Sequence, residues 1–147
     1  MKTFTVKNPY AYLICADIKP IENRTWPTKF RGRILIHSSA KAMKEDPYAL
    51  LGFEKWHSLS PGQRVLLRSN TLENSAIIGS VEIVDCFRND TANCFQKPPS
   101  IWGEKDCFNW VLTNPVLFAN PITNVKGRLS FWDYQMTEEE YLNIEKM

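Results

Sequence analysis

A nine-residue segment, IKPIENRTW, gathers side chains of complementary chemistry near the start of the chain. If residues 21–26 are extended, alternate side chains share a face, so Glu22, Arg24 and Trp26 point the same way and Lys19 lies just upstream. A guanidinium offers a planar pair of donors to a phosphate or a base edge, and an indole offers a stacking surface. The spacing therefore suits a site for a phosphate or a base, and a surface ion pair between Glu22 and Arg24 or Lys19 is the alternative.

Glu82 and Trp102 are two further candidates for functional residues. Glu82 lies on a predicted strand over residues 76–87, on a face that is otherwise largely apolar. A carboxylate in that setting is either an edge charge or a buried, cation-paired group that serves as a base or accepts from a base amino group. Trp102 follows Pro98-Pro99 in a predicted loop and is a candidate for stacking. The neighbours expected on the face of Glu82 are Ile78, Ser80, Val84 and Cys86.

Charge is unevenly distributed along the chain. The net charge is +2, but residues 1–70 carry 12 Lys and Arg against 5 Asp and Glu, whereas residues 71–147 carry 6 against 11. Cations interleaved with aromatic side chains suit phosphate contact combined with base stacking, and a solvated basic surface is the alternative. The densest basic stretch comprises Lys19, Arg24, Lys29, Arg31 and Arg33, interleaved with Trp26 and Phe30.

Composition restricts the class of protein. The chain has 147 residues, 44% hydrophobic and 23% charged, which is ordinary for a globular protein and enough for one domain over residues 1–147. It contains no apolar run long enough to span a bilayer and no signal-peptide pattern, so we expect a cytoplasmic protein without a membrane partner. Four unevenly spaced cysteines with no CxxC, and two histidines, predict free thiols, no metal site and no cofactor.

Local signals predict the elements that position these residues. Asn8-Pro9 opens a helix over residues 9–17, which Pro20 ends, and Asp46-Pro47 opens another that reaches residue 57. Thr137 and Glu140 form a capping box for a C-terminal helix over about 137–146. Gly79, inside the strand at 76–87, suggests a bulge or a close backbone approach. Further strands are expected at 33–38, 63–68 and 122–132, the last interrupted at Gly127, with a strand or turn at 108–112 and a long loop at 88–104.

These elements predict an α+β fold: a small, closed, mixed β-barrel of five or six strands with flanking helices. At this level the pattern resembles the ASCH domain family, a branch of the PUA-like β-barrels, over nearly the whole chain. The family's Gly-x-Lys-x-x-Glu-x-Arg signature is present, with Asp17 in place of the glycine. The resemblance is carried by Asn8 to Ala11, Ile18 to Trp26, Arg31 to Ser39, Ile78 to Asp85, Trp110 to Leu112 and Pro121 to Trp132.

The resemblance implies binding of RNA or a nucleotide in a cleft lined by the signature segment. One branch is similar to a small amidohydrolase that acts on acylated cytidine through a lysine, a threonine three positions later and a glutamate. Lys19 and Glu82 match two of these positions, and Glu22 stands at the threonine position. Other members are metal-assisted ribonucleases, a chemistry for which Lys19, Glu22 and Arg24 are the candidates.

The leading hypothesis is therefore a module that binds RNA or a nucleotide. Glu22 or Glu82 would accept from base amino groups, and the cations would contact phosphate. The second hypothesis is a hydrolase acting on RNA or a modified nucleoside, with Lys19, Glu22 and Glu82 as catalytic residues. A third is a protein-interaction domain. Binding residues in the leading hypothesis are Lys19, Glu22, Arg24, Trp26, Arg31 and Trp102, and the oligomeric state is left open.

Overall fold

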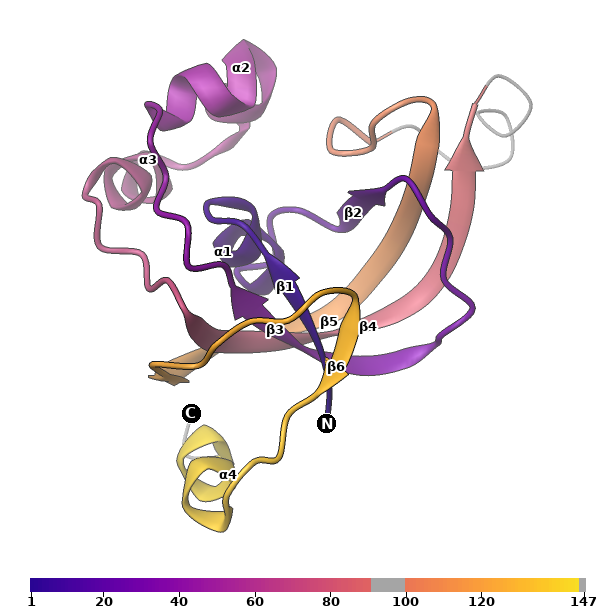
Figure 1. Ribbon diagram of the computed structural model, residues 1–147. Helices are drawn as coiled ribbons and strands as arrows, with labels where there is room; N and C mark the ends of the chain where they lie inside the picture. The colour runs from indigo at the N-terminus through magenta and orange to yellow at the C-terminus, as the bar shows by residue number, and fades with distance from the viewer. Residues whose placement is uncertain (91–99, 146–147) are drawn as a thin grey trace.

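The computed structural model describes residues 1–90 and 100–145, which contain one curled sheet of six strands (Figure 1). The strand order is β2-β5-β4-β3-β1-β6; β1 and β3 are parallel, and all other neighbours are antiparallel. The expected α+β fold around a barrel-like sheet is confirmed, but β2 and β6 lie at opposite ends of the order, so the barrel is half open rather than closed. The strands are β1 (Lys2–Val6), β2 (Ile21–Arg24), β3 (Gly32–Ser38), β4 (Ala76–Asn89), β5 (Cys107–Ile122) and β6 (Phe131–Asp133).

Four helices flank the sheet in the described residues: α1 (Tyr10–Cys15), α2 (Pro47–Ser58), α3 (Pro61–Arg68) and α4 (Glu138–Glu145). Helix α1 packs against β3, β4 and β5, whereas α4 contacts β5. Side chains cap three of the four N-termini in the described residues, and the caps of α2 and α4 are the ones expected from the sequence. The caps are Asp46, which accepts from the Tyr48 N–H, and the reciprocal pairs Ser60–Gln63 and Thr137–Glu140.

Two predicted elements are wrong, and the first error has a local cause. Residues 63–68 form helix α3 rather than a strand, because Ser60 Oγ accepts from the Gln63 N–H while Gln63 Oε1 accepts from the Ser60 N–H. The predicted final strand at 122–132 is instead the end of β5, an irregular connection over 123–130, and the short β6. Within the predicted loop at 88–104, residues 88 and 89 continue β4, and residues 91–99 lie outside the described part of the chain.

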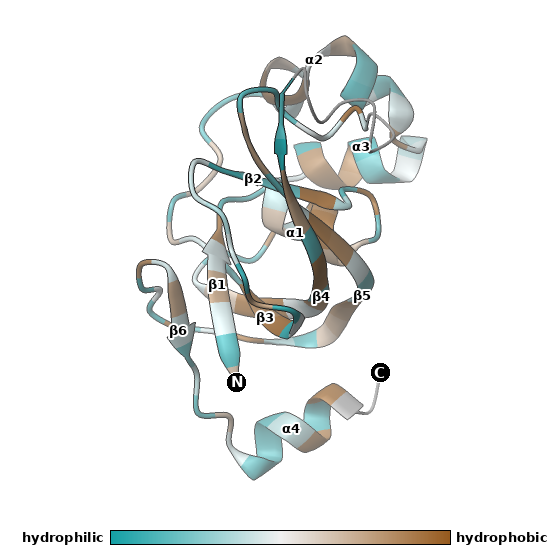
Figure 2. Ribbon diagram, turned by 90° about the vertical axis from the view of Figure 1, so that its right-hand side faces the viewer, coloured by the Kyte–Doolittle hydropathy of each residue, from teal (hydrophilic) through white to brown (hydrophobic). Residues whose placement is uncertain are grey.

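The main core fills the inside of the half-barrel around Trp110, which is fully buried. Trp110 stacks on Phe131 at 5.5 Å between ring centroids and contacts Phe4 at 5.0 Å and Trp26 at 4.8 Å. Figure 2 shows hydrophobic stretches along β3, β4, β5 and α1, whereas α2, α3 and α4 alternate between hydrophobic and hydrophilic residues. A second cluster lies among α1, α2 and α3, and a third lies on the outer face of the sheet near α4.

Irregularities in strand β4 decide which side chains face the core. Register shifts along β4 lie between Ile77 and Gly79 and between Ile83 and Asp85, with another between them. Each extra residue reverses the alternation of faces. Ile78 and Cys86 consequently pack on the main core, while Glu82, expected on the same face, points to the opposite side of the sheet beside Arg33.

Gly79 lies where β4 meets both β5 and α1. A Cβ atom at this position would approach the Val116 carbonyl oxygen to 2.2 Å and the Cys15 Sγ to 2.6 Å, so only glycine fits. The close approach expected from the sequence is confirmed. It seals Cys15 in the core, where burial raises the pKa of its thiol to about 12 and makes it a poor nucleophile.

Gly79→Ala is expected to lower the free energy of unfolding by about 3 kcal/mol, because the added methyl forces β5 and α1 away from β4. Gly62→Ala is the matched control: nothing lies within 4 Å of its Cβ position, so stability should stay unchanged or rise by up to about 1 kcal/mol. Urea unfolding of both variants measures the difference. Equal midpoints for Gly79→Ala and the wild type would contradict this packing.

His37 anchors the connection between β5 and β6. Its Nε2 lies 2.7 Å from the Val125 carbonyl oxygen, which can only accept, so Nε2 carries the proton. Nδ1 then accepts from the Thr5 hydroxyl at 3.0 Å, and that oxygen accepts from Trp132 Nε1 at 3.3 Å. The network uses a neutral imidazole, which agrees with burial lowering the pKa of His37. His37 is therefore a buried residue with both ring nitrogens bonded.

Stability is expected to decrease as the pH falls below about 6.5, the ordinary pKa of histidine. The unfolded chain then protonates this imidazole while the folded protein resists, so protons favour unfolding. His37→Gln keeps an N–H for Val125 and does not titrate. Urea unfolding should therefore show that the free energy of unfolding of the wild type, relative to that of the variant, decreases from neutral to acidic pH. A difference between the two free energies that does not change with pH would contradict this prediction.

Candidate functional site

Glu22 is the centre of a buried charge cluster on β2. Only 9% of its side chain is exposed, and each carboxylate oxygen contacts a different cation. Lys19 Nζ lies 3.3 Å from Oε1, and Arg24 Nη2 donates to Oε2 at 2.9 Å. Lys19, 5% exposed, also donates to the Ile21 carbonyl. The predicted association of Lys19, Glu22 and Arg24 is thus present in the structure.

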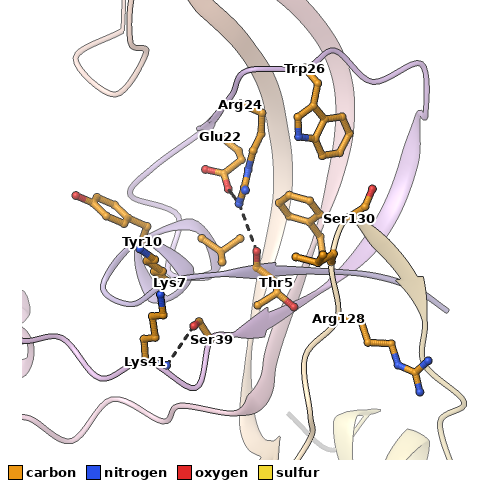
Figure 3. A pocket seen from close by; sticks show the side chains of 13 residues that line it. Thr5, Lys7, Tyr10, Glu22, Arg24, Trp26, Ser39, Lys41, Arg128 and Ser130 are labelled. Carbon is orange, nitrogen blue, oxygen red and sulfur yellow. Dashed lines mark hydrogen bonds and ion pairs between the residues drawn. The ribbon is translucent and has the colours of Figure 1, made fainter.

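Arg24 extends from β2 across the concave side of the sheet to β1. Its Nη2 donates to the Thr5 carbonyl at 3.3 Å, and its guanidinium lies 4.3 Å from the centre of the Phe4 ring (Figure 3). Among the described residues, Arg24 Nε is the one buried side-chain nitrogen or oxygen without a hydrogen-bond partner. Such unmet donor capacity is unusual in a buried group.

A cavity of about 680 Å³ opens beside this cluster, and we call it the first hollow. In Figure 3, the side chains of Glu22, Arg24 and Trp26 reach the first hollow from β2 and the segment that follows it. Lys7 lines the hollow from the residue after β1, and Tyr10 lines it from the start of α1. Its volume falls in the range of small-molecule sites. The lining residues are Phe4, Thr5, Val6, Lys7, Tyr10, Glu22, Arg24, Trp26, Ser39, Lys41, Arg128, Leu129 and Ser130.

The hollow combines cations with aromatic surfaces. Lys7, Arg24, Lys41 and Arg128 supply positive charge, and Glu22 is the one carboxylate among the described lining residues. Tyr10 keeps its hydroxyl proton, because burial first and then nearby carboxylates raise its pKa. Burial also lowers the pKa of Lys19, against the opposing effect of Glu22. The arrangement offers phosphate contacts, stacking surfaces and a fixed acceptor.

The other predicted site residues lie elsewhere. Glu82, on the outer face of β4, pairs with Arg33 at 3.5 Å and does not meet Lys19. Trp102 is 5% exposed and packs in the cluster of α1, α2 and α3, with the Lys55 ammonium over its ring. Arg31 donates to the carbonyls of Thr28 and Phe30 and lies 3.9 Å from Asp85, outside the hollow.

The residues present do not fit a catalytic metal ion. Glu22 has both oxygens committed to Lys19 and Arg24, and a divalent ion would compete with these two cations. In the described part of the chain, no three His, Cys, Asp or Glu side chains gather closely enough to hold a metal.

Several lining residues were missed in the sequence because they come from other segments. Lys7 follows β1, Lys41 follows β3, and Arg128 lies in the connection before β6. The pair of basic residues flanking Gly127 was the available signal for the last of these. Tyr10 was hidden because a tyrosine at the start of a helix is usually a packing residue.

Glu22→Gln is expected to lower the free energy of unfolding by about 3 kcal/mol at neutral pH, because it leaves the buried Lys19 charge without a carboxylate. The loss should shrink as the pH rises toward the ordinary lysine pKa of about 10.4, since the buried amine then sheds its proton before the unfolded chain does. Glu82→Gln, which breaks a half-exposed pair, should cost less than about 1 kcal/mol. Similar urea midpoints for the two variants would contradict the structural role of Glu22.

Comparison with known proteins agrees with this fold. The ASCH domain model matches residues 4–122. Activating signal cointegrator 1 from Homo sapiens is 30% identical over 131 residues, and the Mus musculus protein is 28% identical over 132 residues. Each alignment covers 87% of this chain and 21% of the relative, so the chain spans about a fifth of the length of these proteins.

Two solved structures share the fold at low identity. The crystal structure of ASCH from Zymomonas mobilis is 12% identical with a TM-score of 0.53, covering 99% of this chain and 94% of that one. A tyrosine-to-phenylalanine variant of the Zymomonas protein is 13% identical with a TM-score of 0.50, covering 99% and 96%. Among the described residues, no helix is long and apolar enough to cross a membrane. The chain belongs to the ASCH domain family.

Proposed function

We propose that the protein binds a nucleotide of single-stranded RNA, or a free nucleotide, in the first hollow. The observation that carries the proposal is the joint lining of one cavity by Arg24, Lys7 and Lys41 and by the rings of Tyr10 and Trp26. Cations provide the salt-sensitive attraction to phosphate, and aromatic faces accept an unstacked base.

Glu22 contributes selectivity for the base. Oε1 accepts from Lys19 and from the Asn23 N–H, whereas Oε2 accepts from Arg24, so Oε2 keeps a lone pair that can accept from a base amino or imino group. Lys19 and Arg24 hold the side chain in one orientation before any ligand arrives, which reduces the entropic cost of recognition. Lys19 therefore acts as a positioning residue beneath Glu22.

Binding is supported better than hydrolysis or protein interaction. A hydrolase working through Lys19 and Glu82 needs both groups at one substrate, and the irregular register of β4 separates them. A protein-interaction role, suggested by the name Activating signal cointegrator 1, would use a broad exposed apolar patch. The hollow instead combines charge with aromatic rings, the chemistry of nucleotide recognition.

Fluorescence polarisation with a labelled single-stranded RNA of mixed sequence tests the proposal. Two or three phosphate contacts predict that affinity falls about tenfold as salt rises from about 50 to about 200 mM. Arg24→Ala should weaken binding about tenfold further, because it removes a charged donor from the hollow. A DNA of the same sequence reports whether binding depends on the sugar. The length of the RNA after incubation with the protein reports whether it has been cleaved.

Arg33→Ala is the matched control. Arg33 and Arg24 are strand arginines with 33% and 31% of the side chain exposed, and each pairs with a glutamate, but Arg33 lies on the outer face. Its loss should leave RNA affinity unchanged, and urea unfolding of both variants, under the binding conditions, checks that weaker binding by Arg24→Ala is measured on folded protein. Absence of RNA and nucleotide binding at low salt, or equal loss in the two variants, would overturn the proposal.

A further inference from the structure

A second cavity, of about 690 Å³, adjoins the first, and we call it the second hollow. Both cavities are lined by Thr5, Ser39, Lys41, Arg128 and Leu129, so they share a border rather than lying at separate sites. We call the two adjoining hollows at the ends of β1 and β3 the cleft. The remaining lining residues of the second hollow are His37, Ala40, Ser75, Asn124, Val125, Lys126 and Gly127.

The two hollows differ in chemistry. The first has tyrosine, phenylalanine and tryptophan rings and a carboxylate beside four cations, Lys7, Arg24, Lys41 and Arg128. The second has three cations, Lys41, Lys126 and Arg128, and among its described lining residues none is acidic and none is Phe, Tyr or Trp. Cations with hydroxyl and amide groups suit phosphates and ribose, whereas rings with a fixed acceptor suit a base.

The connection between β5 and β6 forms a wall of the second hollow, and hydrogen bonds at Val125 hold this connection in place. Val125 is buried, its N–H donates to the Ser75 carbonyl at 2.8 Å, and its own carbonyl accepts from His37 at 2.7 Å. Gly127 lies against the imidazole, where a Cβ atom would come within 2.8 Å of His37 Cε1. Residues 126–130 are thereby held at the edge of the cleft.

Leu129 stands on the border between the hollows with 94% of its surface exposed. A leucine this exposed contributes almost nothing to folding, and it directly follows Arg128 and borders a cation-lined cavity. An apolar side chain there gains buried area only if a ribose or base comes to rest on it. A bare pyrophosphate would leave it in water.

We infer that the cleft binds at least two consecutive nucleotides of a single strand. The base of one nucleotide occupies the first hollow, the phosphate that links it to the next lies in the second hollow near Lys126 and Arg128, and Leu129 packs against the second nucleoside. The inference rests on the proposed function of the first hollow and names its ligand class as an oligonucleotide rather than a mononucleotide.

Isothermal titration with matched ligands tests this inference. Each of the four nucleoside 5′-monophosphates is compared with its 5′-diphosphate and with the 5′-phosphorylated homodinucleotide. The dinucleotide should bind about tenfold more tightly than the monophosphate, because it adds a charge-assisted phosphate contact. Its log affinity should also depend more steeply on log salt, by about 0.7.

Substitutions at the second hollow test its phosphate contact and its nucleoside contact separately. Lys126→Gln should remove most of the extra salt dependence of the dinucleotide, and Leu129→Ala should weaken the dinucleotide about fivefold. Lys105→Gln and Val65→Ala are the controls, because Lys105 is exposed, Val65 is 70% exposed, and both lie outside the two hollows. These controls should leave dinucleotide affinity unchanged.

The outcomes distinguish the two proposals. Equal affinity for monophosphate and dinucleotide overturns the extended site while leaving nucleotide binding intact. A 5′-diphosphate that binds as tightly as the dinucleotide, with no effect of Leu129→Ala, overturns the strand and assigns the second hollow to a phosphate chain. No heat change with any of these ligands, and no binding of the labelled RNA, overturns the proposed function itself.

Discussion

The reach of Arg24 across the concave side of the sheet is the contact on which the cleft depends. Strands β2 and β1 are separated in the sheet by β5, β4 and β3, yet Arg24 joins them through the Thr5 carbonyl. The guanidinium can stay there, largely removed from water, because Glu22 neutralises it and Lys19 balances the carboxylate in turn. A paired charge cluster thus keeps a half-open barrel curled and leaves polar groups along its mouth, where an apolar contact would have closed it.

Much of the fold could be predicted because its signals are local. Caps and prolines marked the starts of α2 and α4, and Gly79 marked the close approach of α1 to β4. The errors arose where local and tertiary preferences compete. The apolar run around Val65 resembles a strand until the Ser60–Gln63 capping box is taken into account, and β5 continues past two prolines because its pairing with β4 outweighs their local preference.

Only the part of the candidate site that lies on the short strand β2 could be predicted from the sequence. Alternation along β2 placed Glu22 and Arg24 together, and the structure agrees. The position of Glu82 could not be predicted in the same way, because register shifts in β4 arise from pairing with two neighbouring strands. Lys7 and Lys41 join the cleft through the parallel pairing of β1 with β3, a non-local contact that leaves no pattern in either segment.

The cleft is built from two regions of the chain with different relationships to the family. The charge cluster and the aromatic wall fall within the matched residues 4–122, whereas Lys126, Arg128 and Leu129 lie beyond them. The frame that holds this later segment, His37 and Ser75, is itself within the matched part. If the cleft binds as proposed, substitutions in the few residues after β5 would change how a ligand is held at its rim, while the charge cluster on β2 would keep its own contacts.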